Sequence, residues 1–359
     1  MLPRIPAHIA FRRWGWPRLY PFNVVVSVTY RCNSRCRTCN IWQRPPVAEL
    51  SLAEWERVFA GLGQAPYYLT FSGGEPFLRP DLADIVAAGY RLCRPAVITI
   101  PTNGWFTDSV LAQTIAILEA TPQAQVGINL SLDGVGQKHD EIRGRTGSWE
   151  RAMQTYQALR ELRYPNLMLS IHTVVSRFNV ADLPAISEGL MALKPDSYIT
   201  EAAEERVELG TLGAGITPAP DEYDRAAAWL IAQLQRRPAA GFARVAQALR
   251  GQYYRLAARI LHEQRQVIPC YAGWASVHID PTGDVWTCCT RAEPVGNLRQ
   301  RDFDFAAIWF GDRVQALRHS IRAGECACPM ANVSYTNMLL HPPTLARSAV
   351  SYLLSATGR

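Results

Sequence analysis

The feature of this sequence that most constrains its fold is a sixfold alternation between residues 23 and 200. A short run rich in β-branched residues, such as NVVVSVTY at 23–30, is followed each time by a longer amphipathic stretch. Six such units predict parallel strands joined by right-handed crossovers, and strands that are apolar almost throughout fit a sheet covered by helices. The pattern predicts an α/β fold, either an open doubly wound sheet or a partial barrel. In both, the chemistry collects at the C-terminal ends of the strands.

The expected elements follow from the individual runs. The predicted strands are 23–30, 67–73, 96–104, 125–134, 167–175 and 196–200. The predicted helices between them are 51–63, 81–92, 107–120, 148–162 and 182–193. Ser51 and Glu54 have the spacing of a capping box at the start of the first helix. Asp81 is expected to open the second helix.

The chain changes character after the sixth strand. Residues 203–220 shift in composition and are interpreted as a linker. Residues 276–288 alternate and turn at Pro281–Asp284, which predicts a hairpin. Further helices are predicted at 221–237, 242–266, 304–324 and 345–359.

Composition narrows the class of protein. The 359 residues carry 37 basic and 31 acidic side chains, a net charge of +6 that is far from a nucleic-acid-binding signature. No run of about 18 apolar residues predicts a membrane span. No apolar segment of a signal peptide follows the early arginines, so a cytoplasmic protein is expected. Segment 8–22 is basic and aromatic; it is interpreted as an arm that packs Trp14 and Trp16 on the main domain, and peripheral contact with an anionic membrane stays open.

Nine cysteines form two groups and one single residue. Cys93 stands alone on a predicted helix, where a small buried side chain is expected. The odd total and the tight spacings fit metal or cluster ligation in a reducing compartment better than disulfides. The first group follows the first strand with the spacing C-x3-C-x2-C and consists of Cys32, Cys36 and Cys39. Three thiolates on one loop leave a coordination position open on an iron–sulfur cluster or a catalytic zinc.

The loop VTYRCNSRCRTCNIWQ (28–43) resembles the cluster loop of radical S-adenosylmethionine (radical SAM) enzymes. The resemblance implies that its three cysteines hold a [4Fe–4S] cluster whose fourth iron binds SAM. It implies reductive cleavage of SAM to a 5′-deoxyadenosyl radical that abstracts hydrogen from a substrate, chemistry that the cofactor carries. It also implies a partial (β/α)6 TIM-like barrel over residues 23–202, with a small cysteine-rich domain at the C-terminal side.

A second segment, SGGEP (72–76), ends the second predicted strand as the family pattern expects. In the family it holds the methionyl amino group, which implies that SAM binds at Gly73, Gly74, Glu75 and Pro76. The other cofactor-binding residues implied by position are Thr102, Asn103, Ser131, Asp133, Arg143 and Asn179. Thr38 stands where relatives often have an aromatic residue that supports adenine. This departure leaves the stacking contact open, with Trp42 or Tyr30 as the alternatives, and does not affect the cluster.

The second cysteine group resembles the auxiliary-cluster extension called SPASM, or its shortened form, twitch. The resemblance implies one auxiliary [4Fe–4S] cluster, with Cys289 as a spare or alternate ligand. The ligands implied are Cys270, Cys288, Cys326 and Cys328. A small zinc site remains the alternative, because four thiolates also suit zinc. The expected domains are an arm (1–22), the core (23–202), a linker with helices (203–267), the auxiliary domain (268–330) and a tail helix (331–359).

The resemblance implies an enzyme acting on an unknown substrate: a peptide, a sugar alcohol or a lipid-linked molecule. It implies a flavodoxin- or ferredoxin-type electron donor, and from the net charge no nucleic-acid partner is expected. His172 on the fifth strand and Glu201 after the sixth are candidate catalytic bases, followed by Glu204 and Glu205; a core histidine and a solvated loop are the alternatives. Two other classes also remain, a non-catalytic iron–sulfur electron carrier or sensor and a zinc-binding scaffold.

Overall fold

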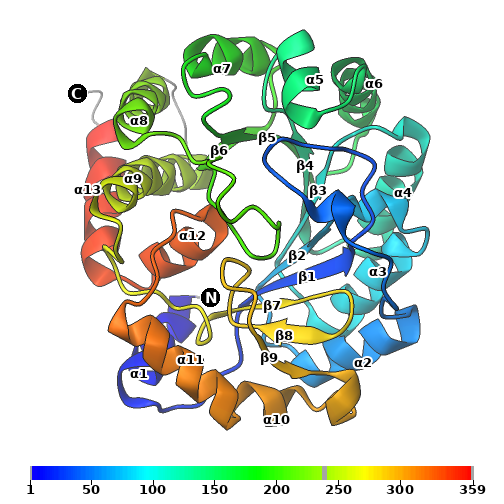
Figure 1. Cartoon of the computed structure of the whole chain (residues 1–359), viewed down its shortest axis with the longest axis vertical. Helices are drawn as coiled ribbons and strands as arrows, with labels where there is room; N and C mark the ends of the chain where they lie inside the picture. The colour runs from blue at the N-terminus through cyan, green and yellow to red at the C-terminus, as the bar shows by residue number, and fades with distance from the viewer. Residues whose placement is uncertain (1, 237–240, 357–359) are drawn as a thin grey trace.

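The computed structural model describes residues 2–236 and 241–356, and its centre is one open sheet of nine strands (Figure 1). The first six run parallel and lie side by side in sequence order: β1 Asn23–Thr29, β2 Tyr68–Gly73, β3 Val97–Thr102, β4 Gln125–Ser131, β5 Leu167–Val175 and β6 Ser197–Ala202. β6 is an edge strand, so the sheet does not close into a full barrel. The predicted α/β fold with a partial barrel is confirmed.

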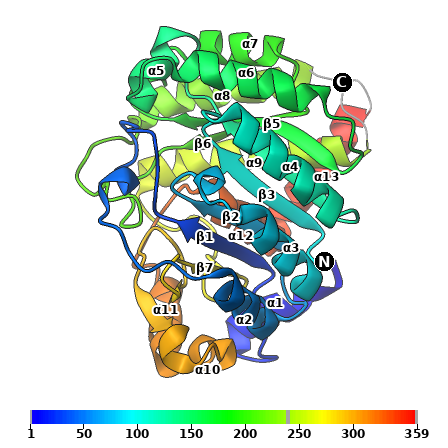
Figure 2. The ribbon, with the colours of Figure 1, turned by 90° about the vertical axis from the view of Figure 1, so that its right-hand side faces the viewer.

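Helices cover the outer face of this sheet (Figure 2). They are α2 Leu52–Leu62, α3 Leu82–Cys93, α4 Thr107–Ala120, α5 Gln137–Arg143, α6 Ser148–Glu161 and α7 Leu183–Ala192. Alternate residues of β1, Val24 and Val26, are fully buried in the same apolar cluster as Trp55 and Phe59 of α2. Cys93 ends α3 at 1% exposure, the buried position expected for it.

The inner face of the sheet is closed by helices from the second half of the chain. These are α8 Pro220–Arg236, α9 Gly241–Glu263, α12 Ala331–Leu339 and α13 Pro342–Ala356. The Tyr253 hydroxyl of α9 accepts from Ala202 N of β6 at 3.1 Å. On the opposite side, Asn23 Nδ2 of β1 donates to Thr336 Oγ1 of α12 at 2.8 Å. Helix α12 therefore lies against the concave side of the sheet (Figure 1).

The cysteine-rich region extends the same sheet. Strand β7 Ser276–Ile279 pairs in parallel with β1, and β8 Asp284–Trp286 and β9 Pro294–Asn297 continue it antiparallel. The predicted hairpin at 276–288 is confirmed. The helix predicted over 304–324 is two helices, α10 Phe305–Trp309 and α11 Asp312–Ala323. The break comes at Gly311, which takes an extended conformation before α11.

Several local predictions differ from the structure. Asp81 makes no capping hydrogen bond, because its carboxylate binds the Arg79 guanidinium at 2.8 Å instead. Helix α5 has only seven residues and was not predicted. The last residue of the helix predicted at 221–237 and the last three of the helix predicted at 345–359 lie outside the described residues. None of the helices in the described part of the chain has the length and apolar character that crossing a bilayer requires.

The N-terminal arm packs on the domain, but its tryptophans do not. Helix α1 Ile5–Trp14 buries His8 and Phe11. The prediction that Trp14 and Trp16 also pack is wrong, since they are 70% and 75% exposed. The reason is local, because the left-handed Gly15 ends the helix at the edge of the domain and turns the chain away from it.

Candidate active site

The loop after β1 brings three thiols to one place. The three thiols are close enough for the charge of one to raise the pKa of another; they belong to Cys32, Cys36 and Cys39. All nine cysteines of the chain are free of disulfide bonds. Burial raises the pKa of Cys32 to about 11 and that of Cys39 to about 12. Three half-buried thiols on one loop, with no disulfide between them, fit a cluster that takes three protein ligands.

Helix α5 holds the cysteine loop from the side. The backbone N–H groups of Arg35 and Arg37 donate to the carbonyls of Arg143 and Ile142 at 3.2 and 2.8 Å. These carbonyls lie at the C-terminal end of α5, where the helix itself supplies no N–H group to bond them. The short helix that sequence reasoning missed is thus a support of the cluster loop.

The Arg143 side chain reaches into the same place. Its Nε lies 3.0 Å from the Asp133 carboxylate, and its Nη1 lies 3.8 Å from Cys36 Sγ. Burial alone would lower the pKa of Arg143, but the charges of Asp133 and Cys36 outweigh it and raise the pKa. Arg143 was predicted to contact SAM; in this structure it joins the end of β4 to the cysteine loop, and its contact with SAM stays a prediction.

The two glycines of SGGEP lie directly against the start of the cysteine loop. A Cβ on Gly73 would lie 2.2 Å from the Thr29 carbonyl oxygen, and one on Gly74 would lie 2.2 Å from that of Arg31. Gly73 also has φ +130°, which side-chain-bearing residues rarely adopt. The backbone of this segment pairs with the loop, since Gly74 N donates to the Thr29 carbonyl at 2.8 Å. Only glycine permits this contact.

Glu75 is a buried carboxylate at 3% exposure. It accepts from Thr102 Oγ1 at 2.8 Å, from Asn103 N at 2.7 Å and from Phe77 N at 3.3 Å. Burial raises the pKa of Glu75 to about 7 despite these donors. Among the described residues Glu75 forms no ion pair, and a buried carboxylate of this kind is suited to a ligand ammonium group, so these residues fit the methionyl amino group of SAM.

Asp133 and Asn179 hold the strand ends together. Asp133 Oδ1 accepts from Val174 N at 2.9 Å, and Asn179 Nδ2 donates to the Asp133 carbonyl at 2.9 Å. Ser131 is paired in register with His172 across β4 and β5. The structure thus gives Asp133 and Asn179 local roles at the strand ends, and their contacts with SAM stay predictions.

The four cysteines predicted to bind the auxiliary cluster come together from three separate segments. Cys270, Cys288, Cys326 and Cys328 pack against one small apolar cluster that includes Tyr271. The thiol of Cys288 lies within electrostatic range of those of Cys270 and Cys326, and the thiol of Cys328 lies within range of those of Cys270 and Cys288. This arrangement fits a four-thiolate centre.

Cys289, the predicted spare ligand, belongs to a different group of side chains. Its Sγ accepts from Arg206 Nη1 at 3.4 Å and lies 3.2 Å from Met330 Sδ. Arg206 Nη1 also lies 3.5 Å from Glu208, which in turn lies 3.6 Å from His278 Nε2. Cys289, Glu208 and His278 have the spacing of metal ligands, but the Arg206 guanidinium contacts the thiol and the carboxylate, so the cation of this group is an arginine.

Part of the segment interpreted as a linker lines the interior instead. Glu204 is only 8% exposed, so the alternative of a solvated loop is wrong for it, and Glu208 is buried as well, at 5% exposure. Sequence reasoning missed Arg206, Glu208 and His278. The only signal was the spacing of acidic and basic residues in EAAEERVE at 201–208, which suits a solvated loop equally well.

His172 and Glu201, two of the predicted candidate bases, are brought together on the neighbouring strands β5 and β6, where Glu201 lies within β6 and not after it. His172 Nε2 lies 3.6 Å from Glu201 Oε1, and both side chains are about four-fifths buried, at 20% and 17% exposure. Burial raises the pKa of Glu204 to about 8, and Glu204 Oε2 has no hydrogen-bond partner among the described residues. These groups can accept a proton or a hydrogen bond from a ligand in the interior.

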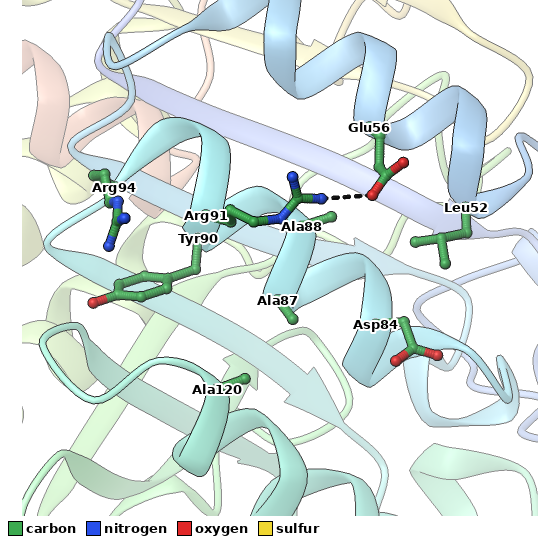
Figure 3. Close-up of a pocket in the computed structure, with 9 residues that line it drawn as sticks. All are labelled: Leu52, Glu56, Asp84, Ala87, Ala88, Tyr90, Arg91, Arg94 and Ala120. Atoms are coloured by element: carbon green, nitrogen blue, oxygen red, sulfur yellow. Dashed lines mark hydrogen bonds and ion pairs between the residues drawn. The ribbon is translucent and has the colours of Figure 1, made fainter.

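A hollow on the outer helix layer is not part of this site. It holds about 460 Å³ and lies between α2, α3 and α4 (Figure 3). The ion pair of Arg91 and Glu56, 2.6 Å long, lies along its wall. Its lining contains no cysteine or histidine, so the outer hollow lacks the ligands that the interior provides.

Two family models match the chain. The radical SAM superfamily model matches residues 26–188, and the iron–sulfur cluster-binding domain model, SPASM, matches residues 270–329. Together they cover more than half of the sequence. The first match contains the cysteine loop and SGGEP, and the second contains all five cysteines of the auxiliary group.

Curated relatives match over most of their length. The mycofactocin maturase MftC of Mycobacterium tuberculosis is 27% identical over 315 residues, covering 85% of this chain and 75% of the relative. The PqqA peptide cyclase of Xanthomonas campestris pv. campestris is 28% identical over 314 residues, covering 80% and 73%.

A solved structure has the same fold. It is Streptococcus suis SuiB bound to S-adenosylmethionine, with a TM-score of 0.61 at 15% identity, covering 83% of this chain and 68% of that one. The chain therefore belongs to the radical SAM superfamily with a SPASM domain, and it is an enzyme whose cofactors are a [4Fe–4S] cluster, SAM and auxiliary iron–sulfur clusters.

Proposed function

We propose that this enzyme modifies a peptide held between its two groups of thiols. One observation carries the proposal: a single segment, residues 204–210, connects the two groups. Asn40 N, next to the cysteine loop, donates to the Leu209 carbonyl at 2.9 Å. The preceding residue reaches the second group, since Glu208 N donates at 3.4 Å to the carbonyl of Cys289, the neighbour of Cys288. Residues on this segment are thus suited to contact a substrate from either side.

The cofactor ligands follow from the donor sets. Cys32, Cys36 and Cys39 would hold the [4Fe–4S] cluster, and Glu75 would bind the SAM ammonium group. When bound, the cluster and SAM supply a 5′-deoxyadenosyl radical that takes a hydrogen atom from the substrate. The auxiliary cluster would be held by Cys270, Cys288, Cys326 and Cys328. A flavodoxin- or ferredoxin-type protein is the proposed electron donor.

The substrate would be oriented by polar groups on β5 and β6 and on the segment that follows β6. Glu204 is buried with one oxygen unpaired, which is costly unless a ligand donates to it. Glu201 and His172, 3.6 Å apart, are placed to take a proton from the substrate. Arg206 fixes the segment, because its guanidinium lies 3.5 Å from both Glu204 and Glu208.

The peptide class is supported by a relative over most of its length, the PqqA peptide cyclase. Other relatives are named for heme and porphyrin synthesis, so the substrate class needs its own test. That test is 5′-deoxyadenosine release by anaerobically reconstituted, dithionite-reduced protein, with Cys32→Ala as control. Radical SAM chemistry predicts that the wild type releases 5′-deoxyadenosine and that Cys32→Ala does not. A protein that binds iron but does not cleave SAM would instead be an electron carrier or sensor.

The substrate arm of the test adds cell extract fractions to the same reaction. A peptide substrate predicts that a fraction increases nucleoside release and that protease treatment of the fraction abolishes the increase. Persistence of the increase after proteolysis would reject the peptide and favour a small or lipid-linked molecule. Glu204→Gln should weaken the response to the active fraction while leaving substrate-free SAM cleavage close to the wild-type rate.

A further inference from the structure

A projecting turn at the end of α1 carries two exposed tryptophans. Helix α1 ends at Trp14, and Gly15 caps it in the left-handed conformation with its N–H bonded to the Phe11 carbonyl at 2.9 Å. Trp14 is 70% exposed and Trp16 is 75% exposed, whereas the other eight tryptophans of the chain are buried or half-buried. Two neighbouring indoles in water are an exception in this molecule and indicate a contact surface.

The turn is not a loose end, because the arm on either side of it is anchored. Arg12 Nε donates to the Cys270 carbonyl at 2.8 Å, and Trp309 Nε1 donates to the Leu19 carbonyl at 2.9 Å. Phe11 is 2% exposed. The exposed indoles are therefore held in place on a fixed base beside α11 (Figure 1).

The arm that carries the turn is basic. Residues 1–22 contain four arginines and no acidic residue. Two of the four, Arg13 and Arg18, are exposed in the turn itself, and Arg322 of α11 donates to the Arg12 carbonyl at 2.6 Å. Burial and the charge of Arg18 lower the pKa of Arg318 to about 9. Within the described residues, none of these arginines forms an ion pair with a carboxylate, so their charge is uncompensated.

We propose that the turn formed by Trp14 and Trp16, flanked by Arg13 and Arg18, docks the enzyme on the surface of an anionic lipid bilayer. Indole rings prefer the interface between lipid headgroups and acyl chains. Arginines beside them are attracted to anionic headgroups, at roughly a fivefold gain in binding for each side chain near the surface. A protein partner would need acidic groups facing every arginine, while a bilayer supplies negative charge over its whole surface.

Docking would also orient the enzyme. The arm is bonded directly to Cys270 through Arg12, so the auxiliary thiol group lies on the side of the molecule that faces the bilayer. This inference is independent of the proposed function, because it rests on the arm alone and needs neither SAM cleavage nor a peptide substrate.

The test is sedimentation of the full-length protein, reconstituted anaerobically, with phosphatidylcholine vesicles that contain or lack phosphatidylglycerol. We expect binding only to the anionic vesicles, weaker binding as salt is raised and a blue shift of tryptophan fluorescence. Trp14→Ala/Trp16→Ala should weaken binding roughly tenfold or more. Arg13→Gln/Arg18→Gln should weaken it about 25-fold. Neither double variant should change 5′-deoxyadenosine formation without vesicles.

Matched controls separate the turn from general effects of charge and exposed apolar groups. Phe106→Ala/Leu212→Ala removes side chains that are 41% and 65% exposed elsewhere on the surface. Arg151→Gln/Arg163→Gln removes two exposed arginines that form no ion pair within the described residues. Both controls should bind like the wild type. The proposal is overturned if the wild type does not bind anionic vesicles, if the tryptophan variant binds equally well, or if the controls lose as much binding.

Discussion

The two groups of thiols are built in opposite ways. The first group comes from eight consecutive residues of one loop, at positions 32–39, whereas the second combines three segments that span positions 270–328. The first packs Cys32 and Cys39 against a small cluster of Tyr30, Ile41 and Trp286, but it also has polar supports, among them Glu75 and the ion pair of Arg143 with Asp133. The second rests on an apolar cluster with Tyr271 and Trp274. A local loop can be positioned by hydrogen bonds, whereas a centre assembled from distant segments depends on the packing that brings them together.

The largest contrast should come from the cysteines themselves. Cys32→Ala should abolish SAM cleavage, while Cys270→Ala/Cys328→Ala should retain it and lose about four of roughly eight bound iron atoms. Cys289→Ala should keep the full iron content, because Cys289 lies with Arg206 and Met330. Iron analysis measures the bound iron, and 5′-deoxyadenosine release measures SAM cleavage. A loss of about four iron atoms in Cys289→Ala would show that it is a cluster ligand after all.

The polar support of the first group is the next target. Arg143→Gln leaves the buried Asp133 carboxylate without its cation, so the free energy of unfolding should fall by about 3–5 kcal/mol. Arg160→Gln is the matched control, since its ion pair with Asp196 is also 3.0 Å long but about 40% exposed, with side chains at 42% and 43%. The control should lose less than about 1 kcal/mol. Urea unfolding compares them, and equal losses would contradict the role given to Arg143.

The contact between SGGEP and the cysteine loop should respond to a single methyl group. In Gly74→Ala the new Cβ would meet the Arg31 carbonyl at 2.2 Å, so one backbone must move. We expect a loss of about 2–3 kcal/mol in the free energy of unfolding and weaker SAM binding. Gly251→Ala, within α9 and with its nearest contact at 3.7 Å, should instead be neutral or stabilising. Unchanged SAM affinity in Gly74→Ala would contradict this account of the cradle.

The apolar packing of the arm, beside the second group, should show the smallest effect, as a dependence on pH. Burial, with Arg4 nearby, lowers the pKa of His8 from 6.5 to about 4. The unfolded arm therefore binds a proton below pH 6.5 and the packed arm does not, so stability is full above pH 6.5 and falls as the pH drops toward 4. At pH 5.5 the loss is about 1.4 kcal/mol. Hydrogen exchange of residues 5–14 measures it, and His8→Gln should remove the dependence on pH.

The sequence by itself determined the parts of this protein that are local in the chain. The β/α alternation predicted all six core strands, because each strand is a contiguous apolar run with its own crossover. The cysteine loop and SGGEP were recognisable for the same reason, since their chemistry lies within a few neighbouring residues. The capping box of Ser51 and Glu54 is confirmed, because a cap is a contact between residues three apart.

Only the tertiary structure decided which distant residues meet. Periodicity could not show that Arg206, Glu208, His278 and Cys289 form one buried group, because they come from a loop, a strand and a second loop. It could not separate Cys289 from its neighbour Cys288, since adjacent residues in the sequence point to different surroundings. It also misplaced Trp14 and Trp16, because composition cannot tell a buried indole from an exposed one. Whether a side chain is buried depends on the residues that pack around it after folding, and those residues lie far away in the chain.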